Sequence, residues 1–295
     1  MPKLIAKKSN IRIDKYLAEE TEHSRALISK MLSESKITVN QKPIKASYKV
    51  SENDEIEMPE YFSPPVNIEA EDIPLTIVYE DEDIIVINKP SGLIVHPGSG
   101  AKSGTLVNAL MAHTSNLSDT GGELRYGIVH RLDKDTSGLM IVAKNNKTHN
   151  ILSDNFKNKT IKREYIALLT GVFPHESATI DAPIGRDKTN REKMTITANN
   201  SKNAVSHLKV LKKYDKYTLA SFLLETGRTH QIRVHAKYIG YPVYNDPLYN
   251  NGKDEFGQFL HSAKLEFKHP ISGKQLKFEC PLPKEFQDFL DKLED

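Results

Sequence analysis

The chain has 295 residues, of which 38% are hydrophobic and 27% charged, a balance typical of a soluble globular protein with room for two domains. Its single cysteine, Cys280, excludes an internal disulfide and a cysteine-rich zinc site within one chain. The sequence contains no signal peptide and no apolar run long enough to span a bilayer, so we expect a cytoplasmic protein without a membrane partner.

The formal net charge of +2 hides a separation of charge along the chain. Residues 1–49 contain 11 lysines and arginines against 5 acidic residues, whereas residues 50–88 contain 12 acidic residues and no lysine or arginine. The remainder again has an excess of basic side chains. Basic segments of this kind indicate a polyanionic partner such as RNA, although a solvated lysine-rich surface explains them equally well.

The first 59 residues predict a small helix–helix–hairpin domain. Apolar residues recur at helical spacing in residues 11–17 and again in a second helix that Ser24 would cap, and two short strands follow. This pattern resembles the S4 RNA-binding domain, with a small structural cap on the main domain as the alternative. The resemblance implies RNA contacts from the interleaved basic residues Arg12, Lys15, Arg25 and Lys30.

Residues 60–75 are acidic, contain Pro64-Pro65 and lack a clear period, so we predict a linker. This gives domain limits of 1–59, 60–75 and 76–295. Two strands are expected at residues 77–79 and 84–87, followed by a proline-punctuated loop at residues 88–97. Lys89 opens this loop, where it could contact phosphate or be simply a solvated lysine.

The most informative stretch is residues 126–144. Two apolar, β-prone runs, residues 127–132 and 139–143, flank a polar segment with strong turn chemistry, residues 133–138. We therefore expect Asp133 to lie where a strand gives way to a tight loop. Active sites are commonly built from a loop carboxylate on a rigid scaffold, but an ordinary hairpin turn has the same composition.

Three motifs resemble those of the RluA-type pseudouridine synthases, most closely the RluD branch. They are His130-Arg131-Leu132-Asp133 with Thr136-Ser137-Gly138-Leu139, Lys162-Arg163-Glu164-Tyr165, and Gly227-Arg228-Thr229-His230-Gln231-Ile232-Arg233. The resemblance extends over nearly the whole chain. It implies that Asp133 is the catalytic carboxylate, that Tyr165 stacks on the uracil, and that Arg228 pairs with the carboxylate. Arg131 would fill the space that the base vacates, and Arg233 would bind RNA.

The implied reaction breaks the bond between ribose C1′ and uracil N1 and rejoins the base through C5. This isomerisation needs no redox partner or group donor, and the chain contains no nucleotide-binding fingerprint or metal-ligand cluster. We therefore expect no cofactor and no metal. One ionised carboxylate suffices, as a nucleophile at the sugar or the base, or as the base that removes a ribose proton.

These patterns predict an α+β protein: a small S4-like domain followed by a catalytic domain with a mixed, largely antiparallel sheet. The expected function is pseudouridine formation in large-subunit (23S) ribosomal RNA or a ribosomal precursor, by a monomer. A transfer-RNA substrate is the first alternative. A non-catalytic RNA-binding or ribosome-assembly protein is the second, and the presence of Asp133, Tyr165 and Arg228 argues against it.

Overall fold

The computed structural model describes residues 3–21, 25–59, 68–98, 101–121 and 124–294, without the side chains of residues 25–27 and 30. Contacts divide the chain into two compact units, Met1–Asn67 and Ile68–Asp295, which we describe separately. Within the described ranges, no helix is long and apolar enough to cross a membrane.

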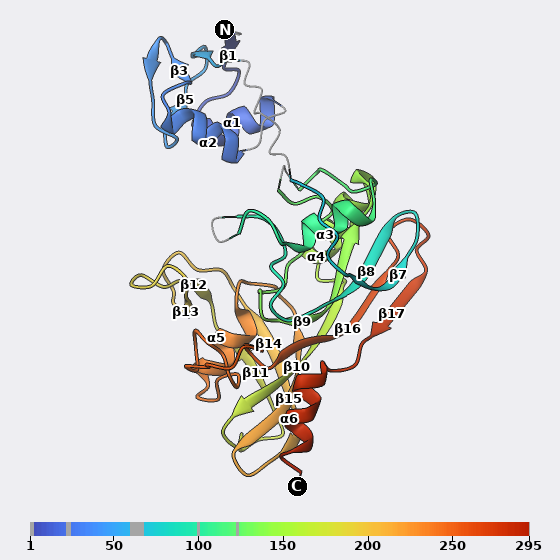
Figure 1. Cartoon of the computed structure of the whole chain (residues 1–295). Coiled ribbons are helices and arrows are strands. Elements are labelled where there is room, and N and C mark those ends of the chain that lie inside the picture. Colours follow the sequence, from blue (N-terminus) through green and yellow to red (C-terminus); the bar gives the residue numbers. More distant parts are fainter. Residues whose placement is uncertain (1–2, 22–24, 60–67, 99–100, 122–123, 295) are drawn as a thin grey trace. The chain divides into compact units, whose positions relative to one another are not determined.

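The N-terminal unit is the predicted helix–helix–hairpin arrangement (Figure 1). Its elements are β1 (Lys3–Ile5), β2 (Ile11–Arg12), α1 (Ile13–Glu20), α2 (Arg25–Ser33), β3 (Thr38–Val39), β4 (Lys42–Pro43), β5 (Lys49–Val50) and β6 (Glu55–Glu57). The apolar residues Ile13 and Leu17 of α1 pack against Ile28 and Met31 of α2 in one buried cluster. Ser24, the predicted cap of the second helix, lies outside the described residues.

The C-terminal unit is built on a mixed sheet. Its strands are β7 (Thr76–Glu80), β8 (Ile84–Lys89), β9 (Ser137–Ala143), β10 (Lys162–Thr170), β11 (Ser177–Asp181), β12 (Ile184–Arg186), β13 (Met194–Ile196), β14 (Val205–Lys213), β15 (Tyr217–Leu224), β16 (Leu260–Lys268) and β17 (Gln275–Glu279). Its helices are α3 (Leu106–His113), α4 (Asn146–Lys157), α5 (Gln231–Tyr238) and α6 (Lys284–Asp291).

Nine of the described strands form one sheet of order β11-β14-β15-β10-β16-β9-β8-β7, with β17 also on β16. All of its pairings are antiparallel except that of β16 with β9. The prediction of a mixed, largely antiparallel sheet is therefore confirmed.

Helices cover both faces of this sheet around β9, a central strand that is buried along its whole length. All seven residues of β9 are buried, and successive side chains of a strand point to opposite faces. Met140 and Val142 join a cluster with residues of α3 and α5, whereas Leu139 and Ile141 join a cluster with Leu152 of α4. At the other end of the sheet α6 packs beside β10 and β15 (Figure 1).

The strand predicted at residues 127–132 is wrong. This segment makes only an isolated bridge, Ile128 to Val142. Two features explain the difference. Gly127 has a φ of 72°, outside the range of a strand, and the Nε2 atom of His130 accepts the backbone N–H of Ile141 at 2.9 Å. A side chain thus takes a hydrogen bond that a neighbouring strand would otherwise make.

Residues 68–75, which the sequence assigns to the linker, contact the C-terminal unit. Ile68 is buried in the main core cluster, the side chain of Asn108 donates to the backbone oxygen of Glu69, and the Glu71 carboxylate accepts the N–H of Gly104. The predicted domain limits remain predictions, but these contacts favour a second domain that begins near residue 68.

Candidate active site

Asp133 lies in a tight loop that leads directly into β9. Its backbone oxygen accepts the N–H of Thr136 at 3.1 Å, as expected for a turn. Gly138 follows with a φ of 109°, and any Cβ there would collide with the backbone of Ser262 in β16. The close contact between β9 and β16 therefore fixes the end of the loop and, with it, the position of Asp133.

The Asp133 carboxylate pairs with Arg233 of α5. The distance from Asp133 Oδ2 to Arg233 Nη1 is 2.9 Å, and Nε and Nη2 of the same guanidinium bind the fully buried Asp246 at 2.6 and 2.9 Å. Burial opposes the charge of Arg233, but the hydrogen bond to Asp246 and the charge of Asp133 together raise its pKa. A planar guanidinium can grip one carboxylate with two donors and still offer a third to another.

This environment keeps Asp133 ionised. Burial on its own would raise the Asp133 pKa, but the charge that His230 carries when protonated, the charge and the hydrogen bond of Arg233, and the charge of Arg131 lower it below its ordinary value. The Nε2 atom of His230 lies 3.8 Å from Asp133 Oδ1. Burial lowers the His230 pKa, so this imidazole is neutral at neutral pH, and Arg233 and Arg131 then supply the positive charge.

Asp133 borders a cavity of about 410 Å³. Its walls come from the loop before β9, the end of α4, β10, and the turn that leads into α5. Tyr165 of β10, which is 6% exposed, is part of the wall. Burial raises the Tyr165 pKa above 10.0, against the opposing charge of Arg163, so the ring carries a neutral hydroxyl at neutral pH.

The structure does not pair the predicted partner, Arg228, with the carboxylate. Arg228 lines the cavity, but its Nε donates to the backbone oxygen of Asn203 at 2.9 Å, and Arg233 makes the ion pair with Asp133. RNA binding by Arg233 remains a prediction, and the structure argues against it, because Arg233 is only 3% exposed and two carboxylates engage its guanidinium.

The local fold explains why Arg233, and not Arg228, pairs with Asp133. The predicted cap, Thr229, is not used. The residue at the cap position is His230, one residue later, which has a φ of 55°, and α5 begins at Gln231. The Gln231 side chain binds Thr226 and the N–H of Arg228, which fixes the turn before the helix. Arg228 therefore belongs to this turn, and Arg233 extends from the first turn of α5.

Comparison with known proteins identifies the family. Residues 83–238 match a model described as RNA pseudouridylate synthase, and residues 11–56 match the S4 domain. The chain belongs to the RNA pseudouridylate synthase family.

Similar proteins agree with this assignment. The synthase is 46% identical over 285 residues to the uncharacterized RNA pseudouridine synthase YlyB of Bacillus subtilis, with 96% of this chain and 94% of that protein covered. It is 44% identical over 235 residues to ribosomal large subunit pseudouridine synthase D of Zymomonas mobilis, with 76% and 74% covered. The structure of human RNA pseudouridylate synthase domain containing 4 matches with a TM-score of 0.59 at 25% identity, covering 74% of this chain and 93% of that one.

Family membership confirms the activity that the motifs predicted. The synthase isomerises uridine to pseudouridine in RNA, and the S4 domain precedes the catalytic domain, as expected.

Lys89, predicted as a possible phosphate contact, has a different position in this synthase. It is 1% exposed, and its Nζ donates to the backbone oxygens of Pro90, Leu93 and Lys134 at 2.8, 2.9 and 2.8 Å. Burial lowers its pKa to about 7, against the opposing charges of Asp135 and Asp133. Lys89 therefore joins its own loop to the loop of Asp133, and its three donors are already engaged by backbone oxygens.

The other predicted RNA-binding residues fall into three groups. Arg131 is exposed and lines the cavity beside Asp133. Arg12 has a side chain that is 53% exposed and pairs with Asp14 at 3.0 Å, and Lys15 lies 3.7 Å from Glu19 with a side chain that is 61% exposed. The side chains of Arg25 and Lys30 lie outside the described part of the chain.

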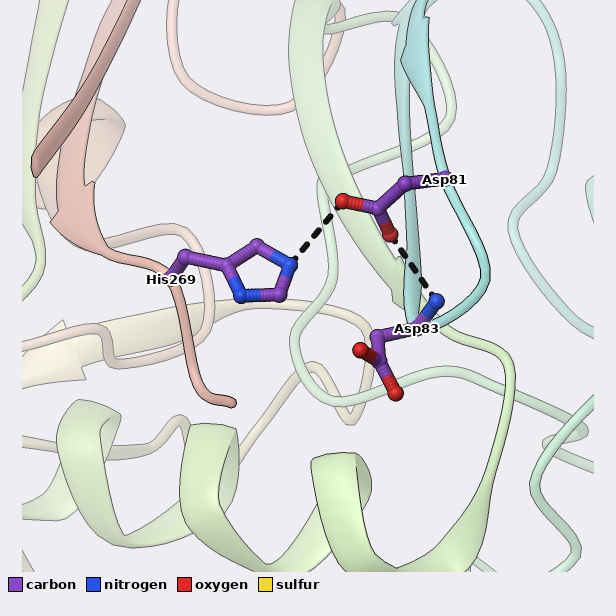
Figure 2. Close-up of side chains that lie close together, drawn as sticks. All are labelled: Asp81, Asp83 and His269. Atoms are coloured by element: carbon purple, nitrogen blue, oxygen red, sulfur yellow. Dashed lines mark hydrogen bonds and ion pairs between the residues drawn. The ribbon is translucent and has the colours of Figure 1, made fainter. Parts of the chain in front are cut away.

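Asp81, Asp83 and His269 form a further cluster of metal-ligand types, in which one ligand atom of each lies within 4.8 Å of the others (Figure 2). Hydrogen bonds already use these atoms. Asp81 accepts from His269 Nε2 at 2.9 Å and from the N–H of Asp83, while His269 Nδ1 accepts the N–H of Ser272. A cation would have to break this network, so we assign the cluster to joining the turn after β7 to the segment after β16.

Proposed function

We propose that this synthase modifies uridines in large-subunit ribosomal RNA and that Asp133 is its catalytic carboxylate. The observation that supports the catalytic role is the Asp133–Arg233 ion pair at the wall of a cavity that also contains Tyr165. Several relatives with 39–44% identity are named ribosomal large subunit pseudouridine synthase D, which favours ribosomal RNA over transfer RNA.

The side chains around the cavity suit an extruded uridine. A base that reacts at its glycosidic bond must leave its stack, at a cost of roughly a few kcal/mol. In our proposal Tyr165 offers an aromatic face to the uracil, and Arg131, exposed beside Asp133, occupies the gap left in the RNA. Asp133 acts on the ribose or the uracil as the anion that Arg233 maintains.

Pseudouridine mapping tests the substrate. Total RNA is compared between cells with and without the gene, and the purified protein is then incubated with unmodified large-subunit ribosomal RNA and with unmodified transfer RNA. We expect the lost modifications to lie in large-subunit ribosomal RNA and the purified protein to restore them. Loss confined to transfer RNA would overturn the ribosomal assignment while leaving the family intact.

We further propose that the synthase acts as a monomer in the cytoplasm. The Asp133–Arg233 ion pair and Tyr165 come together at one cavity within a single chain, which supports this proposal. Sedimentation of the protein with and without RNA checks this. A stable dimer whose dissociation abolishes activity would contradict it.

A further inference from the structure

Arg163 is a buried arginine that the proposed chemistry does not use. It is the second residue of β10 and is 7% exposed. Its guanidinium carbon lies 5.3 Å from the centre of the Phe156 ring. Gly227 leaves room for it, because a Cβ at that position would lie 2.7 Å from Arg163 Nη1. The guanidinium is thus held in place by its surroundings.

The guanidinium has no anion among the residues that the structure describes. Its Nε is buried without a hydrogen-bond partner, and none of the ion pairs of the described residues includes Arg163. Arg233, which is equally buried, is held by two carboxylates. A buried charge without a counter-charge is costly, and buried charges in proteins are normally paired. An anionic ligand in the cavity would supply the missing counter-charge.

The position of Arg163 points to the anion that completes it. Arg163 and Tyr165 are two residues apart on one strand, so their side chains share a face at a spacing of about 7 Å. Both line the cavity that Asp133 borders. The charge of Arg163 lowers the Tyr165 pKa and the charge of Asp133 raises it, so both groups lie near the Tyr165 hydroxyl.

RNA that enters this cavity carries one negatively charged phosphodiester group per nucleotide. The Asp133 carboxylate repels such a group. The unpaired guanidinium attracts it and can bind two of its oxygens in parallel. Lys157, at the end of α4, also lines the cavity and adds positive charge. We propose that Arg163 binds a phosphodiester group adjacent to the target uridine. This proposal rests on the proposed function, because it takes the extruded uridine to lie beside Tyr165.

A neutralised phosphate provides the test. Once the modified uridine has been mapped, a short RNA that contains it is made with a methylphosphonate linkage on its 5′ or its 3′ side. The value of kcat/KM is measured for the wild type, Arg163→Gln and Arg163→Lys, with the RNA well below saturation. The matched control is Lys162→Met, since Lys162 is next in the chain, has a side chain that is 66% exposed, and lies 3.6 Å from Glu266. Thermal unfolding shows that each variant folds.

We expect Arg163→Gln to lower kcat/KM on normal RNA by about 10- to 100-fold, the range for a lost hydrogen bond between charged groups. Lys162→Met should stay near the wild type. One of the two methylphosphonates should slow the wild type by a similar factor and slow Arg163→Gln little further, because the two changes remove one interaction. The kcat/KM of Arg163→Lys on normal RNA should lie between those of the wild type and Arg163→Gln.

Two results would overturn the proposal. One is a folded Arg163→Gln variant with wild-type kcat/KM. The other is a set of rates in which the effects of the variant and of each methylphosphonate simply multiply, which would leave Arg163 as a packing residue against Phe156. The RNA is whichever one contains the mapped uridine, so a transfer-RNA substrate would overturn the ribosomal assignment without affecting this experiment.

Discussion

At the scale of single residues, the charge of Asp133 depends on one guanidinium with three engaged nitrogens. Arg233 binds Asp246 through Nε and Nη2 and Asp133 through Nη1. Asp246 in turn is fixed by accepting the N–H groups of Leu248 and Tyr249. The carboxylate of Asp133 is therefore held by a chain of contacts that begins in a rigid loop, as a preorganised site requires.

Arg233→Lys should lower the single-turnover rate by about 100-fold or more, although it keeps the charge. An ammonium is a point charge on a flexible stem and cannot hold two carboxylates in the geometry of the guanidinium, and small displacements in a site carry large rate penalties. The rate is measured with saturating enzyme.

Arg228→Lys is the matched comparison, because Arg228 lines the same cavity but contacts Asn203. We expect a smaller loss for it, within about 10-fold. A larger loss for Arg228→Lys than for Arg233→Lys would restore the partner that the sequence favoured. Thermal unfolding separates an effect on the site from loss of the buried ion pairs.

At the scale of elements, two neutral histidines hold β9, one at its first residue and one at Ile141. His130 Nε2 accepts the N–H of Ile141. His261 of β16 lies 2.9 Å from Ser137 Oγ through Nδ1 and 3.1 Å from Cys280 Sγ through Nε2. Burial lowers the pKa of His130 to about 3, with a further contribution from the charge of Arg163, and burial lowers that of His261 to about 4.

These pKa values predict a loss of stability in acid. The unfolded chain binds a proton at each histidine as the pH falls below 6.5, whereas the folded chain does not until about pH 4 for His261. The unfolded state is therefore favoured increasingly between these two values. At pH 5 His261 should lower the free energy of unfolding by about 2 kcal/mol, an order-of-magnitude figure.

Denaturant unfolding at pH 7 and pH 5 checks this. The side chain of His261→Gln cannot titrate in this range. From pH 7 to pH 5 its free energy of unfolding should therefore fall by about 2 kcal/mol less than that of the wild type. His175→Gln is the control, because His175 is exposed and should lose as much as the wild type. An equal decrease in the free energy of unfolding for all three proteins would show that His261 does not cause the loss of stability in acid.

The elements also show how far the sequence could predict the structure. Asp133 in a turn before β9, and Tyr165 on a strand, follow from local turn chemistry and alternation. The choice between Arg228 and Arg233 does not, because it depends on where α5 begins and on Asp246, thirteen residues beyond Arg233.

Lys89 and Arg163 were missed for the same reason. Whether a lysine is solvated or bound to three carbonyl oxygens depends on tertiary contacts, here with the loop of Asp133. Arg163 lies within a motif that drew attention to Tyr165, and only the three-dimensional arrangement reveals that it is buried with no anion among the described residues. Lysine and arginine side chains are usually exposed, so the residue type alone predicts an exposed side chain at both positions.

At the scale of the whole molecule, two compact units follow one another along the chain. The first has its own buried core, and residues 1–49 contain 11 basic against 5 acidic residues. We therefore expect the N-terminal unit to contribute RNA affinity through phosphate contacts and the C-terminal unit to perform the reaction.

Deleting residues 1–59 should weaken RNA binding and flatten its dependence on salt, while the C-terminal unit stays folded. Each lost phosphate contact should reduce the slope of log affinity against log salt by roughly 0.7 to 0.9. Binding is measured over a series of salt concentrations, with circular dichroism as the check on folding. An unchanged slope and affinity would show that this unit is not an RNA-binding module.

The central claim is that Asp133 performs the chemistry, and its most direct test is the product formed by Asp133→Asn. The asparagine keeps the size but lacks the anion, so pseudouridine should fall below detection while RNA affinity, held mainly by phosphate contacts, changes little.

Asp135→Asn is the control. Asp135 is two residues away, and its side chain packs in the turn near Gly257, so this variant should retain most activity. Pseudouridine is counted in the mapped RNA after a single turnover with saturating enzyme. The account predicts product from the wild type and Asp135→Asn and none from Asp133→Asn. Near-normal product from Asp133→Asn, or an inactive Asp135→Asn that is folded and binds RNA, would contradict it.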